Sequence, residues 1–167
     1  MSESEPVPPL ARGGGRHRAR EVALQVLYAI DLRAGEPEPR NHDSETAGAA
    51  TGSVLRGEEV FDRIAENFVV PDSATEFARE LVVAVLDRSA ELDDLLGTHA
   101  KNWRVARMAA VDRNVLRMAV YELRDTRTPV AVVIDEAVDL ARRFGSDSSP
   151  SFVNGVLDAV AREVRAA

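Results

Sequence analysis

The stretch TPVAVVIDEAVDLARRFG, residues 128–145, decides whether the chain is all-helical or mixed. Its apolar run VAVVI, residues 130–134, suits a β-strand by propensity alone. Four more apolar residues follow this run at helical spacing: Ala137, Val138, Ala141 and Phe144. Thr128 and Pro129 provide an N-cap and a proline at the first helical position, and Gly145 provides a C-terminal stop. The whole stretch therefore predicts a helix.

Helical periodicity also accounts for most of the remaining chain. Apolar residues recur at helical spacing in five further stretches: residues 16–32, 58–68, 73–96, 103–125 and 149 to the end. A capping box over residues 73–76 opens one of them, and Ser149-Pro150 repeats the helix start signal. The stretch 103–125 has apolar residues on two faces, which is typical of a central helix with neighbours on both sides. We expect about six helices, no strand, and an all-α fold that forms a compact bundle.

Length and composition suggest one domain with two irregular segments. The chain has 167 residues and an apolar share of 45%, which is enough for a single packed core. Residues 1–15 lack periodicity and predict a disordered tail, so the helical domain is expected over residues 16–167. Within it, residues 33–57 are rich in Gly, Pro, Ser, Thr and charge, and predict a flexible insertion. The start carries no secretory signal and the apolar runs are too short to span a bilayer, so we expect a cytoplasmic protein without membrane contact.

The sequence offers no arrangement of residues that is typical of a catalytic or metal site. Cysteine is absent, which excludes disulfides, thiolate zinc sites and cysteine nucleophiles. The three histidines, His17, His42 and His99, lie far apart, and none has a partner at metal-ligand spacing. The carboxylate pairs at 93–94 and 135–136 are adjacent along helices, so their side chains point in different directions. We expect no enzyme activity, no cofactor and no metal.

Positive charge is concentrated near the amino end of an acidic chain. The formal net charge is −7, which argues against a general nucleic-acid coat. Residues 10–20 nevertheless contain four arginines and no acid, and the segment RHRAR, residues 16–20, leads into the first helix. Arginine-rich segments contact RNA phosphates, and their planar guanidinium groups stack on bases. A short basic run can equally be a solvated tail, and the residues alone leave both interpretations open.

The start of the last helix is a second candidate contact region. Free N–H groups at a helix start attract phosphate. The ring of Phe152 could stack on an unpaired base, and the amide of Asn154 could read a base edge. The alternative is that Phe152 belongs to the core and Gly155 allows two helices to pack closely. An RNA site built from both regions requires them to lie near one another.

Four stretches in this order together resemble the NusB family of bacterial transcription antitermination factors. They are RHRAREVALQVLYAIDL (16–32), AAVDRNVLRMAVYEL (109–123), PVAVVIDEAVDLARRFG (129–145) and SPSFVNGVLD (149–158). The resemblance covers roughly residues 16–32 and 72–162. It implies an all-α fold of about six to seven helices in two small helical subdomains packed on one another.

The resemblance also implies partners and an activity. Members bind the boxA segment of nascent ribosomal RNA leader transcripts, as a heterodimer with the ribosomal small-subunit protein that doubles as NusE. That pair seeds a complex with other Nus factors on RNA polymerase. Carried over by position, the RNA-binding residues are Arg16, His17, Arg18, Arg20, Phe152 and Asn154. The residues carried over to the protein-partner face are Tyr28 and Asp112.

Two other functions and one assembly state compete with this expectation. NusB-like domains also precede the catalytic domain of certain ribosomal RNA cytosine methyltransferases, but this chain has neither the length nor the cysteines for that chemistry. A protein-only helical adaptor, with the basic segment as a mere tail, remains the alternative. A homodimer that masks the arginines also stays possible on sequence grounds.

Overall fold

The computed structural model describes the greater part of the helical domain. The described residues are 14–34, 57–63, 65, 66, 70, 72–100 and 104–166. Most of the predicted tail over residues 1–15 and of the predicted insertion over residues 33–57 lies outside them. The first helix includes residue 15 at its start and residues 33–34 at its end, so both predicted boundaries shift by one or two residues.

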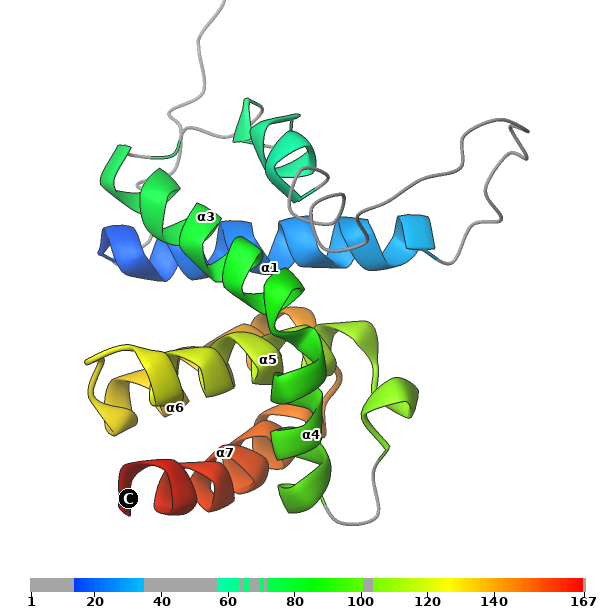
Figure 1. Ribbon diagram of the computed structural model, residues 1–167, viewed down its shortest axis with the longest axis vertical. Coiled ribbons are helices and arrows are strands. Elements are labelled where there is room, and N and C mark those ends of the chain that lie inside the picture. Colours follow the sequence, from blue (N-terminus) through cyan, green and yellow to red (C-terminus); the bar gives the residue numbers. More distant parts are fainter. Residues whose placement is uncertain are drawn as a thin grey trace, which may run out of the picture.

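The described residues form helices and contain no strand, which confirms the prediction of an all-α fold (Figure 1). The elements are α1 (Gly15–Ala34), α3 (Asp72–Asp87), α4 (Ser89–His99), the short 3-10 helix η1 (Val105–Arg107), α5 (Ala110–Asp125), α6 (Val130–Phe144) and α7 (Ser149–Ala166). Residues 57–63 are also helical and precede α3. In Figure 1, α1 and α3 lie together above a second group formed by α4, α5, α6 and α7.

Helix α5 is the centre of the molecule, as its two apolar faces predict. It contacts α1, α3, α4, α6 and α7. Three of its largest side chains, Leu116, Met118 and Leu123, are almost completely buried. Truncating a buried side chain of this size typically costs about 2–5 kcal/mol of folding stability. The helix therefore joins the two groups of helices through one hydrophobic core.

Two of the predicted helices are divided in the structure. The stretch 73–96 forms α3 and α4, which are separated at Arg88, and the helix continues past Gly97 to His99. No Gly or Pro marks this break, and Arg88 forms an ion pair of 2.7 Å with Asp125 of α5. The predicted helix over 103–125 begins only at Ala110, because the backbone at Met108 and Ala109 is extended.

The helix predicted over residues 128–145 is present as α6, and it begins one residue later than predicted. Pro129 occupies the N-cap of α6 and not its first turn. Gly145 is the C-cap, and its N–H donates a hydrogen bond of 2.9 Å to the carbonyl of Ala141. A Cβ atom at position 145 would lie 2.5 Å from the Oγ atom of Ser149, the first residue of α7. The glycine therefore permits the tight connection between α6 and α7.

Within the described residues, no helix combines the length and the apolar character needed to cross a membrane.

Candidate nucleic-acid interface

Arg16 is the exposed cation at the start of α1. Its Nη1 atom donates a hydrogen bond of 3.3 Å to the Oγ1 atom of Thr128. Its guanidinium carbon lies 4.5 Å from the centre of the Phe77 ring, within the range of a cation–π contact. These contacts position the guanidinium group without burying it, and a fixed, exposed guanidinium is well suited to a phosphate.

Arg18 is only partly exposed. Its Nη1 atom forms an ion pair of 2.8 Å with the buried carboxylate of Glu21, and 32% of its side chain remains accessible. Because Glu21 lies one turn later on the same helix, this ion pair fixes the direction of the Arg18 side chain. Arg18 therefore remains a candidate RNA contact beside Arg16.

Arg20, unlike Arg16, is a core residue. It is 4% exposed, and it forms two hydrogen bonds of 2.7 Å, from Nε and Nη2, to the carboxylate of Glu122, which is 2% exposed. Burial opposes the charged form, but the hydrogen bond and charge of Glu122 outweigh it and raise the pKa of Arg20. Glu122 occupies Nε and Nη2, so the structure gives Arg20 a part in the core, and its contact with RNA stays a prediction.

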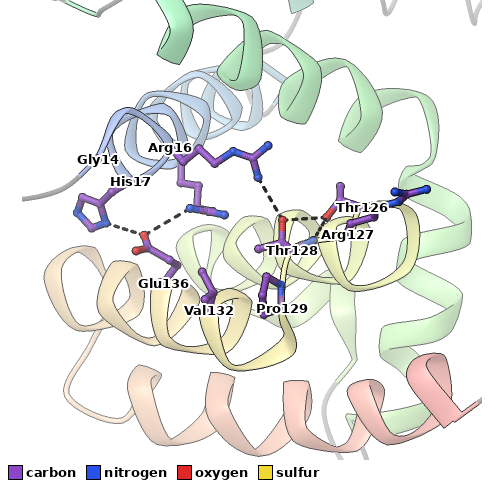
Figure 2. A pocket seen from close by; sticks show the side chains of 10 residues that line it. Gly14, Arg16, His17, Thr126, Arg127, Thr128, Pro129, Val132 and Glu136 are labelled. Carbon is purple, nitrogen blue, oxygen red and sulfur yellow. Dashed lines mark hydrogen bonds and ion pairs between the residues drawn. The ribbon is translucent and has the colours of Figure 1, made fainter.

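His17 lies among carboxylates and joins α1 to α6 (Figure 2). Its Nδ1 atom is 2.6 Å from Glu136, and its Nε2 atom is 3.0 Å from Glu21 and 3.7 Å from Asp139. Three acidic neighbours oppose the approach of a phosphate to this ring. The structure gives His17 a part in docking the two helices, and its contact with RNA stays a prediction.

Arg143 extends the basic region toward the last helix, and the sequence analysis missed it. It lies in the last turn of α6, where its Nη1 atom pairs with Glu21 and lies 3.4 Å from His17. Two residues later, Gly145 begins the connection to α7. Helix α6 thus lies between the start of α1 and the start of α7. Both Arg142 and Arg143 were visible in the sequence, but nothing local showed that Arg143 faces α1.

The start of α7 presents one part-buried ring and two exposed neighbours. Phe152 is partly buried and packs against the core, so the core interpretation accounts for part of its surface. Asn154 and Gly155 are exposed. A Cβ atom added at Gly155 would meet nothing within 4 Å, so the suggestion that this glycine allows close helix packing is wrong.

The two predicted partner-binding residues lie near the junction of α1 and α5. Tyr28 is 41% exposed on α1. One turn later, Asp31 accepts hydrogen bonds of 3.0 and 2.9 Å from Arg113 and Asn114, the residues that follow Asp112 in α5. Asp112 is half-buried, and its Oδ1 atom has no hydrogen-bond partner among the described residues. An exposed aromatic ring and an unsatisfied carboxylate oxygen therefore come from adjoining segments.

Known proteins match this chain over nearly its whole helical part. A family model described as the NusB family matches residues 17–162. The transcription antitermination protein NusB of Solibacter usitatus is 43% identical over 149 residues, which cover 89% of this chain and 90% of the relative. The protein of the same description from Anaeromyxobacter dehalogenans is 42% identical over 146 residues, which cover 87% and 89% of the two chains.

Solved structures agree in fold. NusB of T. maritima superposes with a TM-score of 0.71 at 31% identity, covering 89% of this chain and 91% of that one. A chain in the complex of the antitermination factors NusB and NusE with double-stranded RNA gives a TM-score of 0.69 at 27% identity, covering 92% and 99%.

The fold and these matches place the chain in the class of transcription antitermination factors. The family model spans most of the chain, and relatives well above 30% identity cover nearly nine-tenths of it. The chain belongs to the NusB family.

Proposed function

We propose that this protein is a cytoplasmic, non-enzymatic antitermination factor that binds boxA-type single-stranded RNA in nascent ribosomal RNA leader transcripts. It acts as a heterodimer with NusE, and through that pair it meets the other Nus factors and RNA polymerase. The crystallised complex of a related NusB with NusE and double-stranded RNA supports both partners.

The observation that carries the proposal is the placement of Arg16. A chain of net charge −7 holds this guanidinium exposed, fixed by Thr128 and Phe77, next to the partly exposed Arg18. Phosphate contacts from such residues supply most of the affinity for RNA and make it depend on salt. Phe152 and Asn154 would add base stacking and base reading at the start of α7.

The experiment measures binding of a labelled boxA RNA, with and without NusE, over a series of salt concentrations. Replacing Arg16 and Arg18 by alanine should weaken binding and lower the slope of log K against log [salt] by about 1.4, roughly 0.7 for each lost phosphate contact. The matched control replaces Arg104 and Arg107, two exposed arginines without an ion pair among the described residues. The control should bind RNA as the unaltered protein does.

The protein-only adaptor predicts a different result. It requires normal binding of NusE together with no salt-sensitive binding of RNA. That outcome would contradict the proposed binding of RNA and would leave the proposed binding of NusE unaffected.

The partner part rests on Tyr28 and Asp112 and has its own test. Tyr28→Ala should weaken NusE binding by removing an exposed aromatic contact. Asp112→Asn should slow association with a basic ribosomal protein more than it changes dissociation. Asp158→Asn, an exposed change on α7, serves as the charge-matched control. Unchanged association and affinity in both variants would place the interface elsewhere.

A further inference from the structure

A pocket of about 490 Å³ lies between the start of α1 and the connection from α5 to α6 (Figure 2). Arg16 lines it from α1, and Arg127 lines it from the connection. Thr126, Thr128 and Pro129 form the rest of that side. The pocket is therefore built by two segments more than 100 residues apart in the sequence, and its exposed cations are both arginines.

Arg127 is the residue in this pocket that the fold does not use. It is exposed, and it has no hydrogen bond, ion pair or ring contact with any described residue. Its neighbour across the pocket, Arg16, is held in place by Thr128. An anion in the pocket can accept hydrogen bonds from the fixed guanidinium of Arg16, and from that of Arg127 once its free side chain turns toward Arg16.

The connection that carries Arg127 is held in one conformation. Arg165 of α7 donates from Nε to the carbonyl of Leu123 at 2.7 Å, and from Nη2 to the carbonyls of Thr126 and Thr128 at 3.2 and 2.9 Å. On the other side, the Oγ1 atom of Thr126 accepts the backbone N–H of Thr128 at 3.3 Å. The backbone on both sides of Arg127 is thus tied down, so a ligand has to order the side chain of Arg127 but not its backbone.

The remaining lining residues carry charges of both signs. Glu136, its acid, is bound to His17 at 2.6 Å and lies 3.8 Å from Arg20. Arg20 in turn is neutralised by Glu122. The adjoining start of α6 has no side-chain cap and no acid in its first turn, so its dipole also favours an anion. Because Glu122 balances Arg20, the two arginines Arg16 and Arg127 outweigh Glu136, and the net charge of the lining residues is positive.

We propose that this pocket holds one phosphate group of the bound single-stranded RNA, contacted by Arg127 and Arg16. The inference rests on the proposed function and adds a contact that neither basic motif of the sequence contains. With this contact the RNA runs along α6. Its path leads from Arg143, near the end of that helix, past Arg16 to Arg127, just before the helix begins. A phosphate contact of this kind strengthens binding of every RNA sequence alike.

The test compares Arg127→Ala with Arg104→Ala, which removes the same charge from an exposed position on another connection. Labelled boxA RNA and a scrambled RNA of equal length are titrated with each protein, alone and with saturating NusE. Arg127→Ala should weaken both RNAs by a similar factor, roughly tenfold at low salt, and reduce the salt slope by about 0.7. Arg104→Ala should change neither quantity, and both variants should keep the melting temperature of the unaltered protein.

A second arm separates RNA from free phosphate. Inorganic phosphate at constant ionic strength should compete weakly with RNA for the unaltered protein and less for Arg127→Ala. If Arg127→Ala abolished phosphate binding but left RNA affinity and salt slope intact, the pocket would serve free phosphate and the proposal would be overturned. It would also be overturned if Arg127→Ala bound RNA normally while the Arg16 and Arg18 double variant did not. Absence of RNA binding by the unaltered protein would instead contradict the proposed function itself.

Discussion

Gly155 is a residue that the packing of the fold does not require. A glycine inside a helix costs about 1 kcal/mol relative to alanine. Gly155 lies in α7 with open space where a Cβ atom would stand, so packing does not require it. The cost is therefore not offset by the fold, which favours a role for the bare backbone beside Asn154 in binding.

Replacing Gly155 by alanine should stabilise the protein and weaken its binding of RNA. The expected gain is about 1 kcal/mol, or a rise in melting temperature of roughly 2–4 °C for a chain of this size. Thermal unfolding and RNA titration of the same preparation check both parts. A more stable variant with unchanged RNA affinity would show that the binding site does not need the glycine.

Tyr121 is a residue whose ionisation should be linked to unfolding. Burial, followed by a hydrogen bond of 2.9 Å from its hydroxyl group to Glu80, raises the pKa of Tyr121 from 10.0 to about 12. The folded state thus binds this proton more tightly than the unfolded state does. The contribution to stability is fully present below pH 10 and is lost as pH rises toward 12, by at most about 2–3 kcal/mol.

The measurement is an absorbance titration of tyrosinate in a Tyr28→Phe variant, where Tyr121 is the one remaining tyrosine of the chain. Its ionisation should occur well above pH 10 and should coincide with loss of helical circular dichroism. Ionisation near pH 10 in a protein that remains folded would contradict the burial of this hydroxyl group.

At the scale of elements, α6 is the helix that positions the two halves of the candidate interface. Its middle and last turns hold the start of α1 through Glu136 and Arg143, and its end leads directly into α7. Arg165 of α7 fixes the connection between α5 and α6 through hydrogen bonds to three carbonyl groups. The geometry of the basic surface therefore depends on residues that do not belong to it.

Arg165→Gln should loosen the connection between α5 and α6. Losing the charged donor to three carbonyl groups should cost about 1–2 kcal/mol of stability, because hydrogen bonds to charged groups are the stronger ones and Arg165 is partly solvated. RNA affinity should fall as it does for Arg127→Ala, although Arg165 itself does not line the pocket. Urea unfolding and RNA titration check the two effects.

The matched control for this prediction is Arg162→Gln, one turn earlier on α7. Arg162 is exposed and forms no hydrogen bond or ion pair with the described residues. Equal effects from both substitutions would mean that net charge, and not the fixed connection, determines RNA affinity.

At the scale of the whole molecule, a buried ion pair joins the two groups of helices. Arg20 comes from α1 and Glu122 from α5, and both are almost inaccessible to water. Buried pairs often contribute little net stability, because desolvation of the charges offsets their attraction. Removing one partner alone is costly, because the other charge is left buried and unpaired.

Arg20→Ala should therefore destabilise the protein by about 3–5 kcal/mol. The double change Arg20→Met with Glu122→Met should recover most of that loss and should keep the RNA affinity and salt slope of the unaltered protein. Urea unfolding and RNA titration at low temperature measure both. A salt slope reduced by about 0.7 in the folded double variant would show that Arg20 contacts RNA.

The sequence by itself determined the helical class, the positions of most helices and the arginine-rich start of the chain. It could do so because helical periodicity, caps and charge clusters are local properties of the chain. The resemblance of four ordered stretches then indicated the family, which the family model and the relatives confirm.

Only the tertiary structure decided which arginine serves the fold and which stays free. Arg20 is buried because its partner lies 102 residues away in α5, and nothing near it in the sequence predicts that contact. The same docking of α1 brings Arg16 to the connection that carries Arg127. Burial and pairing depend on which faces of distant helices meet, and local periodicity fixes the faces but not their partners.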